Sequence, residues 1–126
     1  MKINILTLFP EMFSSLRESI LGRADAAGII SFNIINIRDF SADRHNKTDD
    51  YPFGGGQGMV LMPQPAFDAL KAAGAEGTRN IYLSPRGKLL GMKLAAELAS
   101  EDEITLFCGH YEGLDQRVID EWNIQL

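Results

Sequence analysis

The sequence predicts an α/β protein with a mainly parallel sheet flanked by helices, and three observations support this prediction. Short apolar segments rich in β-forming residues alternate with segments whose apolar residues recur at helical spacing. Glycine or proline stands at most of the junctions between them, where regular elements end. The 126 residues contain no repeat, low-complexity tract or linker that would separate two domains. Such an alternation is typical of βαβ units, whose strands run parallel.

The first such unit is expected at the N-terminus. Lys2–Leu8 is apolar and rich in β-branched residues, which predicts a strand. Pro10 can occupy the first turn of the helix that follows, and Gly28 is suited to end that helix. Ile29–Ile37 then predicts a second strand, largely buried.

A long irregular stretch separates this unit from the rest of the chain. Arg38–Gly58 is charged at first and then rich in glycine, and connections of this length are usually functional or disordered. After Pro63 and Pro65, apolar residues at helical spacing from Ala66 to Ala73 predict a helix that ends at Gly74.

The remaining elements continue the alternation of strand and helix. Asn80–Leu83 and Glu103–Phe107 predict two further strands, with a helix around Leu94–Leu98 between them. Gly109–Gly113 is expected to turn the chain, and Leu114–Trp122 to form a last short helix.

Composition limits the class of protein. Hydrophobic residues at 45% and charged residues at 23% are close to the globular average. No apolar run approaches the roughly 18–20 residues of a membrane span, and the first residues lack the features of a signal peptide. A single cysteine, Cys108, agrees with a reducing compartment. We therefore expect a soluble, cytoplasmic protein without a membrane partner.

The net charge of −5 and the pI of about 4.9 argue against a general, basic nucleic-acid binder. Phosphate contacts need clustered Lys and Arg side chains, which this composition does not suggest. Any contact with RNA must therefore be local, or be completed by residues outside this sequence.

Two loops at strand ends are candidates for a ligand site, because ligands of open parallel sheets bind at the carboxyl ends of the strands. The first loop is Ser84–Gly87 and the second is Cys108–Gly113. In the second loop Tyr111 and Glu112 stand between two glycines. An adenine could lie against this turn and the carboxylate could position a cation or a proton. Alternatively Tyr111 covers the core and Glu112 is an exposed turn residue, and the residues alone leave both interpretations open.

The glycine-rich segment Gly54–Gly58 is a third candidate. Its backbone N–H groups could surround a phosphate, yet it lacks the Lys-Ser/Thr of a Walker A motif and the GxGxxG spacing. A flexible turn and a loop that closes over a substrate are the alternatives.

Other reactive side chains give weaker signals. Cys108 has no adjacent base, so a small buried residue at a strand end is favoured over a nucleophile. His45 and His110 do not form a cluster with metal-ligand spacing. Ser84 lacks the G-x-S-x-G context of a hydrolase.

Several short stretches form an ordered series along the whole chain. They are Leu8–Phe13, Arg38–Phe40, Asp43–His45, Asp49–Asp50, Gly54–Gly56 with Gly58 and Met59, Leu83–Pro85, and Cys108–Gly109 with Tyr111–Gly113 and Asp115. Each stretch is common by itself, but the ordered series is specific. It resembles the bacterial tRNA (guanine-N1)-methyltransferase family of the SPOUT superfamily.

The resemblance implies methyl transfer from S-adenosylmethionine to N1 of the guanosine at tRNA position 37, immediately 3′ of the anticodon. It also implies a homodimer and a SPOUT-like domain in which the cofactor lies in a trefoil knot. Within residues 1–126 that domain would be incomplete and the knot unfinished. The general base, an Asp, would lie beyond residue 126 and the C-terminal tRNA-binding domain would be absent. These 126 residues alone are then expected to be inactive.

The resemblance assigns roles to individual residues. Glu112 would act in catalysis near the methyl donor and would hold a Mg²⁺ ion if one takes part. The residues expected to bind the cofactor are Leu83, Ser84, Pro85, Gly109, Tyr111 and Glu112. Those expected to face the RNA or the partner subunit are Arg44, His45, Asp50, Gly55, Gly56 and Met59.

The chain departs from the family pattern at three positions. The family usually has Arg at Tyr51, Tyr at Phe53 and Arg at His110. Because His is charged only part of the time at neutral pH, the electrostatic role of position 110 is affected. Two alternatives stay open: a SPOUT methyltransferase with another RNA target, and a non-catalytic α/β domain that binds a nucleotide or a partner.

Overall fold

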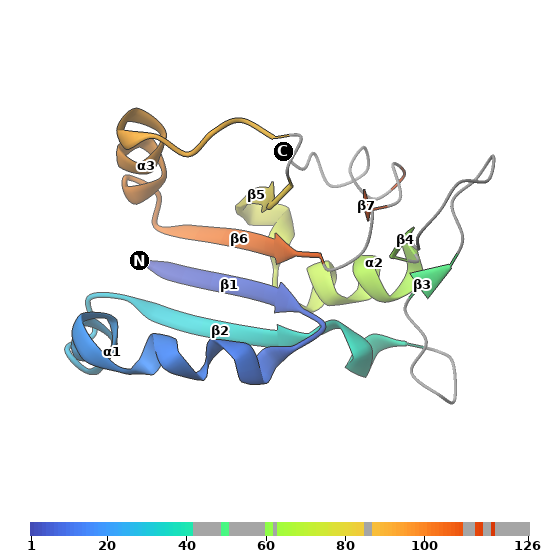
Figure 1. Cartoon of the computed structure of the whole chain (residues 1–126), viewed down its shortest axis with the longest axis horizontal. Helices are drawn as coiled ribbons and strands as arrows, with labels where there is room; N and C mark the ends of the chain where they lie inside the picture. Colours follow the sequence, from blue (N-terminus) through green and yellow to red (C-terminus); the bar gives the residue numbers. More distant parts are fainter. Residues whose placement is uncertain are drawn as a thin grey trace.

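The computed structural model describes residues 1–41, 49–50, 60–61, 63–84, 87–109, 113–114 and 117. Within these residues the main sheet has the strand order β2-β1-β6-β5, and each neighbouring pair is parallel. Its strands are β1 (Lys2–Thr7), β2 (Ser31–Asn36), β5 (Arg79–Tyr82) and β6 (Glu103–Cys108). The predicted α/β class with a mainly parallel sheet is confirmed, and in Figure 1 the arrows of β1, β2 and β6 point the same way.

Helices connect the strands of the main sheet, and a small second sheet lies beyond its carboxyl ends (Figure 1). The helices are η1 (Pro10–Arg17), α1 (Ser19–Ala26), η2 (Ile37–Phe40), α2 (Pro63–Ala72), η3 (Ala75–Gly77) and α3 (Met92–Ala99). The small sheet consists of β3 (Asp49–Asp50), β4 (Val60–Leu61) and β7 (Gly113–Leu114). No helix in the described part of the chain is long and apolar enough to cross a membrane.

An apolar row runs across one face of the main sheet. Leu6 pairs with Ile35 on one side and with Phe107 on the other, and Phe107 pairs with Tyr82. The rings of Tyr82 and Phe107 meet edge to face with centroids 6.0 Å apart. A fully buried Leu or Phe side chain contributes about 1.5–3 kcal/mol to stability. The helix α2 adds buried side chains to the same core: Ala66, Ala69 and Leu70.

A polar row lies on the same face, two residues nearer the start of each strand. Asn4 pairs in register with Asn33 on β2 and with Thr105 on β6, and Thr105 pairs with Asn80 on β5. Asn4 and Thr105 are fully buried, and Asn80 is 7% exposed. Buried polar groups need hydrogen-bond partners. The members of this row bond to one another and to Thr78, and Asn4 and Asn80 also donate to the Glu103 carboxylate and the Ala75 carbonyl.

The hydrogen bonds of the polar row run in one direction. Asn33 donates from Nδ2 to Asn4 Oδ1 at 3.0 Å, and Asn4 donates from Nδ2 to Thr105 Oγ1 at 3.3 Å. The hydroxyls of Thr105 and Thr78 are 2.7 Å apart, and Thr78 donates to Asn80 Oδ1 at 2.6 Å. Because Thr78 has one hydroxyl proton, Thr105 is the donor in their contact. The row therefore forms a continuous chain of hydrogen bonds across all four strands.

In Figure 1, α1 lies beside β2, and α3 lies at the other side of the main sheet, beyond β6. An ion pair between Arg79 and Glu97 at 3.0 Å joins β5 to α3. Both side chains are partly exposed, so the pair contributes about 0–1 kcal/mol.

The prediction of one continuous helix after the first strand is wrong. The segment divides into η1 and α1, with Glu18 extended (φ −115°, ψ 164°) and Ser19 at a positive φ of 57° between them. Gly22 lies directly against the carbonyl of Arg17, where a Cβ would collide with that group. Neither piece has a fully buried side chain, so no packed apolar face holds a single helix together.

The second strand is less buried than the sequence suggested. β2 forms the edge of the main sheet, and most of its residues are half-buried. The buried residue of this region is Ile37, which begins η2 instead of ending the strand. The burial of a strand depends on its position in the sheet. The apolar character of its residues does not reveal that position.

The C-terminal helix predicted for 114–122 is wrong at its first residue, because Leu114 belongs to β7. Most of the rest of that segment lies outside the described residues. The stretch predicted as irregular, 38–58, contains η2 and β3. The predicted helix ends at Gly28 and Gly74 are confirmed, and both glycines have φ near +70°.

Replacement of Asn4 by Ala should lower the free energy of unfolding by about 2–4 kcal/mol, because it leaves buried partners unpaired. The matched control is Asn36→Ala, whose side chain accepts one bond from the Arg38 amide in a helix cap and should cost about 1 kcal/mol. Urea unfolding of both variants measures the difference. Equal costs would contradict the role given to the polar row.

Candidate active site

The described first residues of the two strand-end loops lie at the same edge of the sheet. Leu83 and Ser84 follow β5, and Gly109 follows β6. The strands pair with Tyr82 opposite Phe107. The Leu83 amide donates to the Phe107 carbonyl at 3.1 Å, which extends the pairing by one residue past β5.

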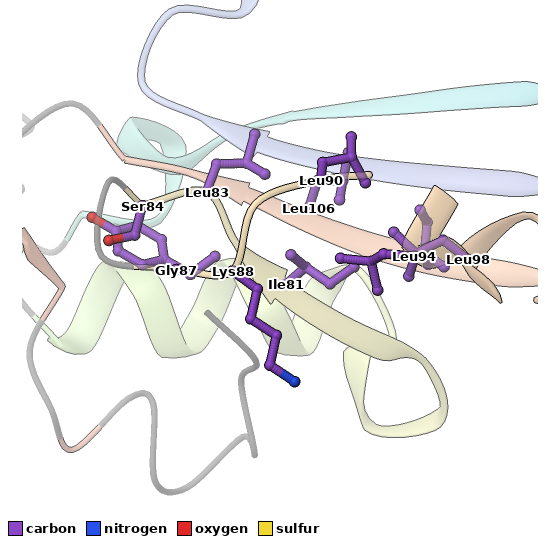
Figure 2. A pocket seen from close by; sticks show the side chains of 11 residues that line it. Ile81, Leu83, Ser84, Gly87, Lys88, Leu90, Leu94, Leu98 and Leu106 are labelled. Atoms are coloured by element: carbon purple, nitrogen blue, oxygen red, sulfur yellow. The ribbon is translucent and has the colours of Figure 1, made fainter. Parts of the chain in front are cut away.

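A pocket of about 410 Å³ opens beside β5, between the sheet and the segment that leads into α3 (Figure 2). Its volume falls within the range of roughly 300–1,000 Å³ that is usual for small-molecule sites. Its residues are Ile81, Tyr82, Leu83, Ser84, Gly87, Lys88, Leu90, Leu94, Leu98, Ile104 and Leu106. Most of these side chains are apolar, so the pocket suits a ligand with a flat or aliphatic apolar part.

The polar groups of the pocket lie at one end of it. Ser84 is half-buried, and its carbonyl accepts a hydrogen bond from the Gly87 amide at 3.0 Å, which forms a tight turn. Lys88 is exposed, and Figure 2 shows its side chain extending away from the leucines. An apolar wall with a polar rim can hold a nucleoside-like ligand and orient its polar groups.

Several pocket residues were not predicted as part of a site. Tyr82, Leu90 and Leu106 line the pocket, although the sequence identified the strands mainly as core. The apolar residues along β5 and β6 indicated that these strands are buried. They did not indicate which face of the sheet would be open to a ligand. Leu90 is 66% exposed, and this exposure is a property of the structure that the sequence did not signal.

Cys108 ends β6 and is half-buried. Desolvation by burial raises the pKa of its thiol above the ordinary value. The neutral thiol is therefore favoured at neutral pH, which weakens nucleophilic reactivity. This agrees with the interpretation of Cys108 as a packing residue.

The small sheet joins two stretches that are distant in sequence. Asp50 pairs with Val60 in an antiparallel register, and Val60 pairs with Gly113 in a parallel register. The strand β3, which contains Asp50, is therefore separated from β7, which begins at Gly113, by the single strand β4. The sequence did not predict this sheet, because each of its strands has only two residues.

The structure describes some of the predicted site residues and not others. Leu83 and Ser84 line the pocket. Gly109 directly follows β6 and is not among the lining residues of the pocket, and Asp50 lies in β3. The remaining predicted site residues lie outside the described residues: Arg44, His45, Gly55, Gly56, Met59, Pro85, Tyr111 and Glu112. Among the described residues, no three His, Cys, Asp or Glu side chains gather where they could hold a metal ion.

The fold and the pocket define a class: an α/β protein with a parallel sheet and an apolar small-molecule pocket beside the carboxyl end of an outer strand. The profile of the family described as tRNA (Guanine-1)-methyltransferase TrmD matches residues 1–125. The chain belongs to this family.

Individual relatives agree with the family match. The tRNA (guanine-N(1)-)-methyltransferase of Clostridium perfringens (strain 13 / Type A) is 50% identical over 127 residues, which cover 100% of this chain and 54% of that protein. The enzyme of the same name from Ruminiclostridium cellulolyticum is 52% identical and covers 96% of this chain and 54% of its own length. The chain spans about half the length of the curated relatives it matches.

A solved structure supports the fold. The crystal structure of tRNA (m1G37) methyltransferase from Aquifex aeolicus superposes with a TM-score of 0.86 at 32% identity. The match covers 95% of this chain and 56% of the Aquifex chain. The arrangement of the main sheet is therefore that of this methyltransferase.

Iodoacetamide should alkylate Cys108 more slowly in the folded protein than in urea, because the raised pKa leaves less thiolate at about pH 8. The stability contributed by the buried thiol is fully present below the ordinary thiol pKa. It is lost as the pH rises through the raised, folded-state pKa. Mass spectrometry of the alkylated protein measures the rates, with Cys108→Ser as the unreactive control. Equal rates in the folded and unfolded protein would show that burial does not protect the thiol.

Proposed function

We propose that this protein transfers a methyl group from S-adenosylmethionine to N1 of the guanosine at position 37 of tRNA. The observation that carries the proposal is the match to the family over residues 1–125, together with a pocket at the strand end where the family resemblance expects the cofactor. Leu83 and Ser84 belong both to the expected cofactor residues and to the lining of this pocket.

The residues of the pocket fit the proposed cofactor. S-adenosylmethionine has an adenine that can lie against apolar side chains, and the walls beside β5 and α3 are made of Ile and Leu. The backbone groups around Ser84 and Gly109 can donate to or accept from its polar atoms. When bound, the cofactor supplies the methyl group, and the protein's part is to hold it in line with the acceptor nitrogen.

The proposed reaction requires more than cofactor binding. Neutral guanine N1 carries a proton, so a base must accept that proton as the methyl group arrives. Charge that develops on O6 must also be stabilised by a nearby donor. We assign Glu112 a role in positioning these charges, next to Tyr111 and Gly109 in the cofactor loop. The general base is an Asp outside residues 1–126.

Metal binding enters the proposal only through Glu112, the residue that would hold a Mg²⁺ ion. The described part of the chain contains no cluster of three metal-binding side chains. No step of the proposed reaction is therefore assigned to the metal.

RNA binding is proposed for the stretch 44–59, through Arg44, His45, Asp50 and the glycine segment with Met59. The net charge of −5 does not favour a dense basic surface on this chain, which supports an RNA surface that is divided between parts of the protein. We propose a homodimer in which this stretch of one subunit faces the cofactor of the other.

The function is tested with the protein as its gene encodes it, S-adenosylmethionine and unmodified tRNA that carries guanosine at position 37. Nuclease digestion and mass spectrometry should find N1-methylguanosine, and the same tRNA with adenosine at position 37 should gain none. Methylation at another nucleotide would favour a SPOUT enzyme with a different target. Cofactor binding without methylation of any RNA would favour a non-catalytic binding domain.

Glu112→Gln should slow single-turnover methyl transfer about tenfold or more, which corresponds to a barrier at least ~1.4 kcal/mol higher. The substitution keeps the shape of the side chain but removes its charge. Glu76→Gln is the matched control, because Glu76 is exposed in η3, which precedes β5 and lies away from the carboxyl ends of the strands. Transfer by Glu112→Gln at the rate of the wild type would return Glu112 to the role of an exposed turn residue.

The protein should sediment as a dimer at the concentrations where it is active, because each proposed active site takes residues from two subunits. Analytical ultracentrifugation across a dilution series, paired with activity per subunit, measures this. Activity should fall together with the dimer fraction on dilution. A monomer with full activity at nanomolar concentration would refute the shared site.

A further inference from the structure

Gly109 packs closely against the ring of Tyr82. A Cβ placed on Gly109 would lie 2.8 Å from both Cε2 and Oη of Tyr82, and 3.2 Å from Cζ. Such atoms do not approach each other this closely in real structures, so any side chain at position 109 would force one of the two residues to move. All three nearest atoms belong to Tyr82.

The need for glycine at this position comes from the contact, not from the backbone conformation. Among the described glycines, positive φ values occur at Gly28 and Gly74 and not at Gly109. An alanine at position 109 is therefore free of backbone strain and meets only the Tyr82 ring.

The Tyr82 ring cannot easily give way. Tyr82 is 7% exposed and packs edge to face against Phe107, with ring centroids 6.0 Å apart. The backbone hydrogen bond from Leu83 to Phe107 holds the end of β5 against β6 on the same side. Tyr82 also borders the pocket. One rigid ring therefore touches both the pocket and the first residue after β6.

We propose that Tyr82 is a positioning residue that sets where the chain leaves β6 at Gly109, and so fixes the position of Gly109 relative to Leu83 and Ser84, which are expected to bind the cofactor. Leu83 and Ser84 follow Tyr82 directly on one side, and the residues after Gly109 follow on the other. The inference rests on the proposed function, because it assigns the contact a role in binding S-adenosylmethionine.

The experiment is a double-mutant cycle in the protein as its gene encodes it, with the Kd for S-adenosylmethionine measured by calorimetric titration. Gly109→Ala should raise this Kd about tenfold or more, because the added methyl displaces the loop from the Tyr82 ring. In the Tyr82→Leu background the ring is absent, so Gly109→Ala should change the Kd by less than about threefold.

Two controls separate positioning from general damage. Gly77→Ala makes the same chemical change where no atom lies within 4 Å of the new Cβ, and it should leave the Kd unchanged. Phe107→Leu removes a neighbouring buried ring that is not among the nearest atoms to Gly109, so Gly109→Ala should keep its full effect in that background. For Gly109→Ala and Gly77→Ala, the free energy of unfolding in urea and the tRNA affinity without cofactor should change far less than the cofactor Kd.

The outcomes distinguish the inference from the proposed function. An equal effect of Gly109→Ala in the wild-type and Tyr82→Leu backgrounds, with normal cofactor binding by the wild type, overturns the role of Tyr82 alone. A harmless Gly109→Ala does the same. Failure of the wild type to bind S-adenosylmethionine overturns the proposed function, and this inference with it. Loss of the Gly109→Ala effect in Tyr82→Leu, but not in Phe107→Leu, supports the inference.

Discussion

The chain of hydrogen bonds from Asn33 through Asn4, Thr105 and Thr78 to Asn80 is the constraint on which the rest of this structure depends. Apolar side chains tolerate several alignments of neighbouring strands, since burial has no direction. A buried amide does not, because each unpaired group costs about 1–3 kcal/mol. A slip of one residue would turn every side chain of a strand to the opposite face. The polar row therefore fixes the register of the four strands while the apolar row beside it supplies most of the stabilisation.

The register decides what meets at the carboxyl edge. With Asn80 opposite Thr105, Tyr82 must lie opposite Phe107, and the Leu83 amide reaches the Phe107 carbonyl. The segments that follow β5 and β6 therefore begin at the same level along the carboxyl edge of the sheet. An apolar pocket and a close contact with Gly109 both follow from this alignment. The proposed methyl transfer is mainly a problem of positioning, so the proposed site would benefit from a rigid base of strands.

The described side chains around the pocket are mostly unreactive. Cys108 is held as a neutral thiol by burial, and no cluster of metal-binding side chains lies among the described residues. The walls are leucine and isoleucine, with Ser84 and Lys88 at the rim. These residues suit binding and orientation of a ligand, while the proposed proton transfer and charge stabilisation belong to Glu112 and to residues outside this chain. Within the proposed enzyme, the described residues thus bind and orient the ligand.

Local patterns in the sequence determined the class of the fold and the place of its main elements. Helical spacing and a following glycine located α2 and its end at Gly74, and β-branched runs located β1, β5 and β6 to within a residue or two. The ordered motifs also identified the family and the two strand-end loops. Only the tertiary structure decided the order β2-β1-β6-β5, the division of the first helix at Ser19, the small sheet that pairs Val60 with Gly113, and the contact of Tyr82 with Gly109. The physical reason is that periodicity reports which side of an element is apolar, whereas strand order, register and close packing depend on partners far away in the chain.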